Sequence, residues 1–248
     1  MDYQIILVLL AVGLIAGCLN TLAGGGSLLA LPVMIFLGLP PNVANATNRV
    51  AIVLQNIFAV LGFKSKGVSV YPFNVWLGIS AFFGSILGAF LAVDINEDVF
   101  NRILAFVIVG VVIYMAINPL KYFKKEENRN KKATLTSIII FFFIGIYGGF
   151  IQAGVGYLMI MALTLVNGFS LVKTNSIKVF VALTYTSVAL AIFIYYGIIN
   201  WEFGIPLAIG QACGGWLASR WSVKLGDNWI RYFVMITASV FAIKLFFF

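Results

Sequence analysis

Apolar residues fill this chain in long blocks that polar residues interrupt only briefly. A surface helix of a soluble protein keeps a polar face, with its apolar residues three or four positions apart, and these blocks have no such face. Since about 17–25 apolar residues cross a bilayer core, the pattern predicts membrane helices. In chain order, we expect membrane segments at residues 4–22, 24–37, 45–63, 73–92, 99–117, 134–152, 154–167, 175–196, 203–221 and 229–247.

Two of these segments, residues 24–37 and 154–167, are short and open on glycine-rich sequence. The helices that follow the glycines rise only about 16 Å, against about 30 Å for the bilayer core. We therefore expect them to begin inside the protein, where irregular backbone is stable only if it is packed or lines a cavity.

Composition strengthens the membrane assignment, because only 10% of the residues are charged, against about 25% in a soluble domain. The net charge of +8 does not indicate nucleic acid, since no basic face interleaved with aromatic residues is present. Basic residues instead gather in one short stretch, which the positive-inside bias places in the cytoplasm. They are Lys121, Lys124, Lys125, Arg129, Lys131 and Lys132. The lipid bilayer is the expected surrounding, and no nucleic-acid partner is expected.

The sequence repeats itself at an offset of 130 residues. The matching pairs include Gly24 and Gly154, Gly26 and Gly156, Gly38 and Gly168, Asn45 and Asn175, and Gly67 and Gly197. Many transporters are built from such repeats. We therefore divide the chain into a first transmembrane repeat, residues 1–117, a basic cytoplasmic linker, residues 118–133, and a second transmembrane repeat, residues 134–248.

Five segments in each copy would give the second copy the opposite orientation in the membrane. The loop charges agree with this inversion, because the loops that carry Lys66, Lys173 and Lys224 then fall on the inner side. Arg49 and Arg102, near outer ends, are exceptions. The predicted fold is an all-α integral membrane protein of two inverted repeats, each of about five membrane segments including one short helix broken by glycine, with both termini outside.

The ionisable residues point away from catalysis. The chain has no histidine, its two cysteines lie in apolar blocks, where we expect both to be buried, and no carboxylate lies in the middle of a segment. We therefore expect no enzyme activity, metal site or cofactor. The segments do contain Arg49 and Lys178, and the amides of Gln55, Gln152 and Gln211. Cations and neutral donors without acids predict a site for a small anion.

The glycine segments favour the same kind of ligand. The first turn of a helix presents unpaired N–H groups and a positive dipole end, which together bind oxyanions. The alternative is close helix packing through small residues. Asn45 and Asn175 open the following helices and are candidates for N-capping. Arg49 and Lys178 would then lie in a first turn, where a positive charge opposes the helix dipole, and this suggests an anion beside them.

The motifs carry a family resemblance. Gly17-x-Leu19-Asn20-x-x-Ala23-Gly24-Gly25-Gly26-Ser27 resembles the first repeat of the sulfite exporter TauE/SafE family, and Gly148-Gly149-Phe150-x-x-Ala153-Gly154-x-Gly156 resembles the second. The resemblance covers essentially the whole chain. It implies a multi-pass permease of the bacterial inner membrane that exports sulfite, sulfoacetate or related organosulfonates. Val155 stands where the first copy has Gly25, so a symmetric site would be uneven.

These observations together predict one anion site between the repeats, with transport by alternating access. The expected substrate-binding residues are Asn20, Gly24, Gly25, Gly26, Ser27, Asn48, Arg49, Gln152, Gly154, Gly156, Asn175 and Lys178. An anion channel and an accessory membrane subunit are the alternatives. The oligomeric state stays open, with a homodimer among the choices.

Overall fold

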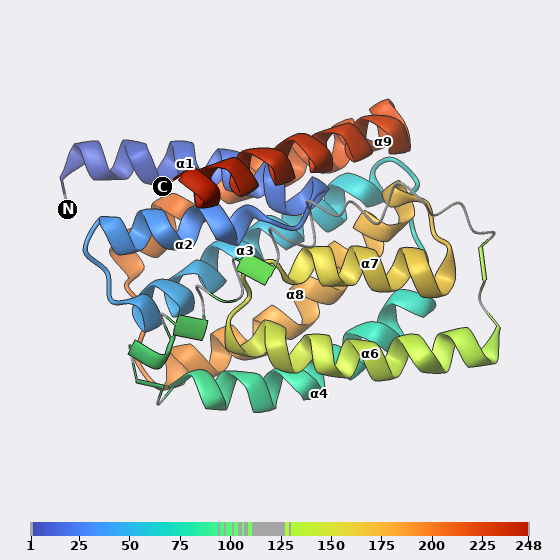
Figure 1. Ribbon diagram of the computed structural model, residues 1–248, viewed down its shortest axis with the longest axis horizontal. Coiled ribbons are helices and arrows are strands. Elements are labelled where there is room, and N and C mark those ends of the chain that lie inside the picture. Colours follow the sequence, from blue (N-terminus) through green and yellow to red (C-terminus); the bar gives the residue numbers. More distant parts are fainter. Residues whose placement is uncertain are drawn as a thin grey trace.

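The computed structural model is all-helical over the residues that it describes. These are residues 2–93, 95–96, 98–100, 102–103, 106, 109–110, 127–128 and 130–247, with side chains as far as residue 224. The helices (Figure 1) are α1 (Tyr3–Leu22), α2 (Gly26–Phe36), α3 (Pro41–Lys64), α4 (Phe73–Val93), α6 (Lys131–Phe150), α7 (Val155–Asn167), α8 (Leu171–Tyr195) and α9 (Trp201–Phe247). The predicted all-α class is confirmed. The expected segment at 99–117 and most of the 118–133 linker lie outside the described residues.

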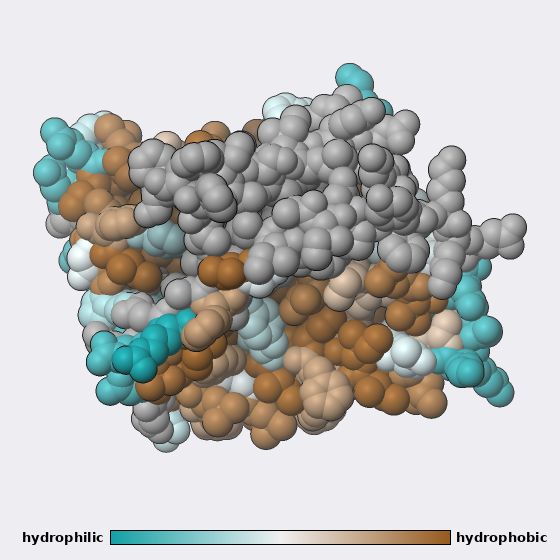
Figure 2. Space-filling view, viewed as in Figure 1, coloured by the Kyte–Doolittle hydropathy of each residue, from teal (hydrophilic) through white to brown (hydrophobic). Residues whose placement is uncertain are grey.

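Five of the described helices, α1, α3, α4, α6 and α8, are long and apolar enough to cross a membrane. The face in Figure 2 shows hydrophobic side chains along its middle, and the hydrophilic ones gather toward the two ends of the long axis. Helices α2 and α7 have only 11 and 13 residues, as the glycine-rich starts predicted. The protein is therefore a multi-pass membrane protein with two short helices.

The starts of α3 and α8 correct one expectation. Helix α3 begins at Pro41, and α8 begins after the N-cap Ser170, whose side chain accepts from the Lys173 N–H. Proline at the first position and serine at the N-cap are strong start signals, and they act four to five residues before the two asparagines. Asn45 and Asn175 therefore lie inside helices, and the interpretation of these residues as N-caps, one of the two roles open to them, is wrong.

The same starts change the argument about the helix dipole. Arg49 and Lys178 lie about two turns into α3 and α8. The dipole effect falls off within the first turn, so a positive charge at these depths no longer indicates an anion by itself. The case for each residue must come from its contacts.

Helix α9 corrects a second expectation, because it covers both expected segments, 203–221 and 229–247, without a break. Gly226, Asp227 and Asn228 lie between the two segments and disfavour a helix, but no proline stands there, and the cost of the three residues does not prevent a continuous helix. Figure 1 places the N and C marks toward the same end of the long axis. The side of the membrane on which the termini lie stays a prediction.

Helices of one half of the chain pack against helices of the other half. Helix α1 lies along α9, and α4 lies along α6, so the first helix of each half packs against the fourth helix of the other. Glycines allow both contacts: a Cβ on Gly17 would overlap the Gln211 carbonyl, and one on Gly88 would overlap the Ile146 carbonyl. Small residues let membrane helices approach closely in this way.

The repeat also extends to backbone conformation. Six glycines in the described part of the chain have a positive φ, and they form three pairs at the offset of 130: Gly24 (φ 88°) with Gly154 (71°), Gly38 (99°) with Gly168 (65°), and Gly67 (73°) with Gly197 (67°). The same three turns therefore occur in both halves, at the breaks after α1 and α6 and at two later turns. The inversion of one half relative to the other in the membrane stays a prediction.

Candidate functional site

The two glycine segments cross each other at the centre of the protein. A Cβ on Gly24 would overlap the Cα of Gly156, and a Cβ on Gly156 would overlap the Cα of Gly24. A Cβ on Gly25 would collide with the Tyr157 hydroxyl, and one on Gly26 with the Ala16 carbonyl. For Gly24 and Gly156, close backbone packing therefore accounts for the glycine.

The start of α2 keeps the N–H groups of an open helix end. Its N-cap, Gly25, provides no side-chain hydrogen bond. The N–H groups of Gly26 and Ser27 find no acceptor among the described residues. At the start of α7, by contrast, the Val155 N–H donates to the Gln152 carbonyl at 3.3 Å. The first helix start is thus the better oxyanion site of the two.

Polar side chains from five helices gather around the start of α2, and we name this group the α2 cluster. Its members are Asn20 and Thr21 of α1, Ser27 of α2, Asn48 and Gln55 of α3, Lys178 of α8 and Gln211 of α9. Helices of both halves contribute, so the α2 cluster lies at their interface.

Neutral amides link the α2 cluster. Asn20 donates to the Gln55 side chain at 2.8 Å, and Gln55 donates to the Thr21 hydroxyl at 3.1 Å. In a second set of bonds, Asn48 donates to the Ser27 hydroxyl at 3.1 Å and accepts from Gln211 at 3.2 Å. Each amide can reorient its donors and acceptors, so the network can rearrange around a ligand.

Lys178 supplies the charge of the α2 cluster. Its side chain is 3% exposed, and its ammonium donates to the Thr21 carbonyl at 2.9 Å. An ammonium has three donors, and among the described residues Lys178 has no second acceptor and no carboxylate partner. A buried cation of this kind is costly in a membrane protein unless an anion binds beside it.

Arg49 has a different environment, although it too is fully buried. Its guanidinium donates to the carbonyls of Gly148, Gly149 and Phe150 at the end of α6, the last two at 3.1 and 3.3 Å. It also donates to the Gln152 side chain and, at 3.3 Å, to that of Asn45. A cation stabilises the carbonyl end of a helix, so Arg49 holds the end of α6.

The remaining predicted residues divide between these two environments. The Gln152 side chain accepts from Arg49 and, at 3.4 Å, from Thr186. Gln152 lies in the break between α6 and α7, and its backbone has a positive φ of 61°. Asn175 donates to the Leu22 carbonyl at 3.0 Å, beside the α2 cluster. Gly154, with its left-handed backbone, is the N-cap of α7.

The structure thus brings Asn20, Gly25, Gly26, Ser27, Asn48, Asn175 and Lys178 to one place, and it assigns Arg49, Gln152, Gly154 and Gly156 to the break after α6. Gly24 lies between the two places, where its backbone contacts Gly156. The predicted set lacked Thr21, Gln55 and Gln211. Gln55 and Gln211 lie inside apolar segments, where a polar side chain indicates a functional role, so the sequence could have added both to the predicted set. Thr21 carries no signal, because a threonine at a helix end is ordinary.

Comparison with known proteins identifies relatives over the full length of the chain. Residues 9–245 match the family model described as sulfite exporter TauE/SafE. The chain is 28% identical to a probable membrane transporter protein of Haemophilus influenzae, over 98% of this chain and 94% of the relative. It is 25% identical to the probable membrane transporter protein ORF9 of a Sinorhizobium species, over 98% and 93%. With YfcA of Escherichia coli K12, another probable membrane transporter protein, the identity is 28%, over 96% and 88%. No solved structure matches the chain.

Proposed function

Because the chain belongs to the sulfite exporter TauE/SafE family of membrane transporters, we propose that it carries small sulfur-containing oxyanions across the bacterial inner membrane. Sulfite, sulfoacetate and related organosulfonates are the expected substrates. The single observation that carries the proposal is the buried ammonium of Lys178, which has one carbonyl partner and no carboxylate among the described residues.

The α2 cluster suits such a substrate. Sulfite and sulfonate groups present three acceptor oxygens, and the site offers three kinds of donor to them. Lys178 provides charge-assisted hydrogen bonds, which are the strong ones. The N–H groups of Gly26 and Ser27 provide fixed donors at the positive end of α2. Asn20 and Asn48 contribute neutral amide donors once their present bonds exchange.

The composition of the α2 cluster supports transport by alternating access. Asn20, Ser27 and Asn48 belong to the first half of the chain, and Lys178 and Gln211 to the second. If one half rocks on the other, the site opens first to one side and then to the other. The crossing of Gly24 and Gly156 holds the two breaks together and is a natural pivot.

The test is substrate binding and transport by the full-length protein. Lys178→Met keeps an unbranched side chain of similar length without the charge, and Lys173→Met is the matched control, since Lys173 lies on the same helix and is 44% exposed. Wild-type protein and the control should be stabilised by sulfite or sulfoacetate in a thermal-shift assay in detergent, and they should show saturable counterflow in proteoliposomes.

Lys178→Met should retain a monodisperse folded form and lose both responses. Retained ligand stabilisation in a folded Lys178→Met protein would exclude the assigned site. Flux without trans-stimulation in the wild type would indicate a channel in place of a carrier.

A further inference from the structure

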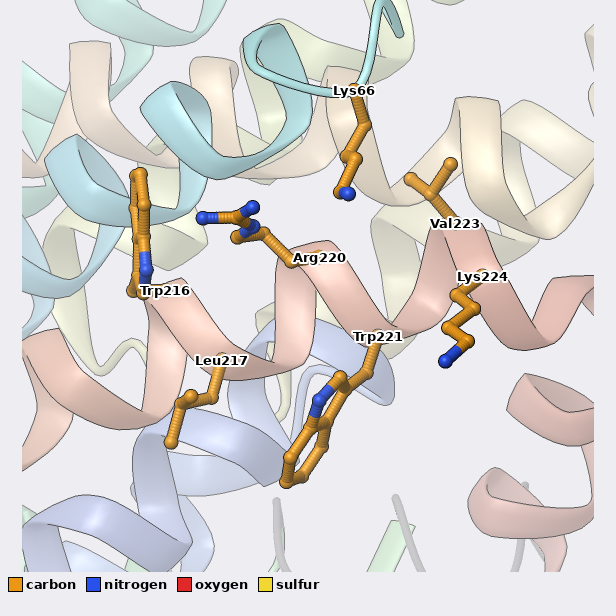
Figure 3. A pocket seen from close by; sticks show the side chains of 7 residues that line it. All are labelled: Lys66, Trp216, Leu217, Arg220, Trp221, Val223 and Lys224. Atoms are coloured by element: carbon orange, nitrogen blue, oxygen red, sulfur yellow. The ribbon is translucent and has the colours of Figure 1, made fainter.

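A groove outside the candidate substrate site runs between the end of α3 and the middle of α9. Its first part is a cavity of about 550 Å³ (Figure 3). The side chains that line it are Lys66, Trp216, Leu217, Arg220, Trp221, Val223 and Lys224. Three of these seven carry a positive charge, so the cavity is a basic one.

Among the described residues, no acidic side chain lines the cavity beside these three cations. Lys66 reaches from the loop after α3 toward α9, where Arg220 extends back toward Trp216 (Figure 3). The Arg220 guanidinium lies 5.1 Å from the centre of the Trp216 ring. Among the described residues, none of Lys66, Arg220 and Lys224 forms an ion pair. Three cations that line one cavity suit a phosphate group.

An apolar second cavity shares Trp216 with the first, and we take the two as the two parts of the groove. This cavity, of about 460 Å³, is lined by Leu54, Phe58, Leu61, Ile209, Ala212, Cys213 and Trp216. Leu61 and Ile209 are 47% and 50% exposed, so the groove opens toward the lipid. Cys213 is exposed here as well, although a buried position was expected from its apolar surroundings.

The basic part and the apolar part lie one after the other along the helices, as the headgroup and the acyl chains do in a lipid molecule. Along α9, apolar Ile209 precedes Trp216, and the basic Arg220 and Lys224 come last. In α3, the apolar residues Leu54, Phe58 and Leu61 likewise precede Lys66, which lies in the loop after the helix. From Ile209 to Lys224 the helix rises about 22 Å, enough for a headgroup at one end and much of an acyl chain along the rest.

The basic end is the one that the positive-inside bias assigns to the cytoplasm. The cytoplasmic leaflet carries anionic lipids, and basic pockets between membrane helices on that side bind their headgroups. Trp216 and Trp221 provide the aromatic side chains that are typical of the headgroup level.

We propose that this groove binds an anionic phospholipid. The phosphate contacts Lys66, Arg220 and Lys224, and one acyl chain lies over Leu61, Phe58 and Ile209. Because α3 and α9 belong to different halves of the chain, the bound lipid bridges the halves on their outer side. The inference does not depend on which substrate the protein carries.

The experiment is native mass spectrometry of the full-length protein in detergent, with phosphatidylglycerol and phosphatidylcholine of identical acyl chains as probes. The wild type should retain phosphatidylglycerol in preference. The triple variant Lys66→Gln, Arg220→Gln and Lys224→Gln should lose at least about tenfold in retention, since each basic side chain near an anionic headgroup contributes roughly fivefold. The control Lys131→Gln, Lys132→Gln and Lys173→Gln removes the same charge from α6 and α8 and should bind as the wild type does.

Two further arms test the acyl chain and the source of the phosphate. Ile209→Trp fills the apolar part at an exposed position, and it should lower phosphatidylglycerol retention with no change in charge. Inorganic phosphate and glycerol phosphate should fail to displace the lipid at equal concentration.

Several outcomes would overturn the proposal. Equal retention of the two lipids by the wild type would do so, as would equal retention by the two triple variants. Displacement by inorganic phosphate would indicate a site for the phosphate alone. A wild-type dimer that the first triple variant or Ile209→Trp converts to a monomer would show that a second copy of the chain covers the groove.

Discussion

Asn45 and Asn175, which stand 130 residues apart, make the same hydrogen bond in opposite directions between the two halves. The Asn45 amide donates to the carbonyl of Phe150, the last residue of α6, at 2.9 Å. The Asn175 amide donates to the carbonyl of Leu22, the last residue of α1, at 3.0 Å. The third helix of each half therefore binds the broken end of the first helix of the other half.

A cation follows each asparagine about one turn later and also donates to carbonyls at the same helix end. The two cations differ in how many carbonyls they bind. Arg49 binds three carbonyls at the end of α6, whereas Lys178 binds the single carbonyl of Thr21 at the end of α1. A helix end inside a membrane protein needs partners for its last carbonyls. The end of α6 has them, and at the end of α1 Lys178 keeps donors for a ligand.

Loss of either asparagine should destabilise the protein. Asn45→Ala and Asn175→Ala each remove a donor from a buried helix end, at a cost of about 1–3 kcal/mol for a buried polar group left without its partner. The apparent melting temperature in detergent measures this cost. Asn42→Ala is the control, because within the described part of the chain the Asn42 side chain bonds only to the N–H of its neighbour Val43. If all three variants melt together, the bonds between the halves do not contribute.

Arg49 and Lys178 should respond differently to loss of charge. Arg49→Met leaves the carbonyls of Gly148 and Gly149 without their donor, at about 1–3 kcal/mol for each, so the variant should lose thermal stability. Lys178→Met removes one hydrogen bond and an uncompensated buried charge, so its stability without ligand should fall much less. Melting curves recorded without substrate measure the difference. The reverse order of stabilities would contradict the roles given to the two cations.

The crossing of the glycine segments should not tolerate a methyl group. Gly24→Ala and Gly156→Ala place a Cβ against the backbone of the opposite segment, so both variants should fold poorly or fail to transport. Gly38→Ala is the matched control: Gly38 also has a positive φ, but a Cβ there meets no atom within 4 Å. Gly38→Ala should lower the free energy of unfolding by only about 1–2 kcal/mol, the cost of a left-handed backbone for a residue with a side chain. The yield of monodisperse protein and proteoliposome flux measure both effects, and a normal Gly24→Ala protein would disprove the crossing.

The inverted repeat predicts that both termini lie outside the cytoplasm. Alkaline phosphatase fused to the C-terminus should then be active, and green fluorescent protein fused there and exported by the general secretory route should stay dark. A reporter inserted in the basic stretch near Lys124 should give the opposite pair of results. A C-terminal fusion that fluoresces in the cytoplasm would exclude the predicted orientation.

The sequence by itself determined the features that depend on neighbouring residues. Long apolar blocks gave membrane helices at nearly the observed bounds, as for 73–92 and Phe73–Val93, because the length of an apolar run is a local property. The short helices were predicted correctly because glycine interrupts helices locally. The offset of 130 was visible because the same turn needs the same residue, as at Gly38 and Gly168.

Only the tertiary structure decided what depends on partners more than a hundred residues away. Asn45 and Asn175 resembled N-caps in the sequence, since their acceptors, Phe150 and Leu22, belong to the other half. Arg49 and Lys178 were equivalent candidates in the sequence. In the structure, Arg49 binds several carbonyls at the end of α6, whereas Lys178 binds a single carbonyl. A buried charge is defined by the groups that surround it, and in this chain those groups come from the opposite repeat.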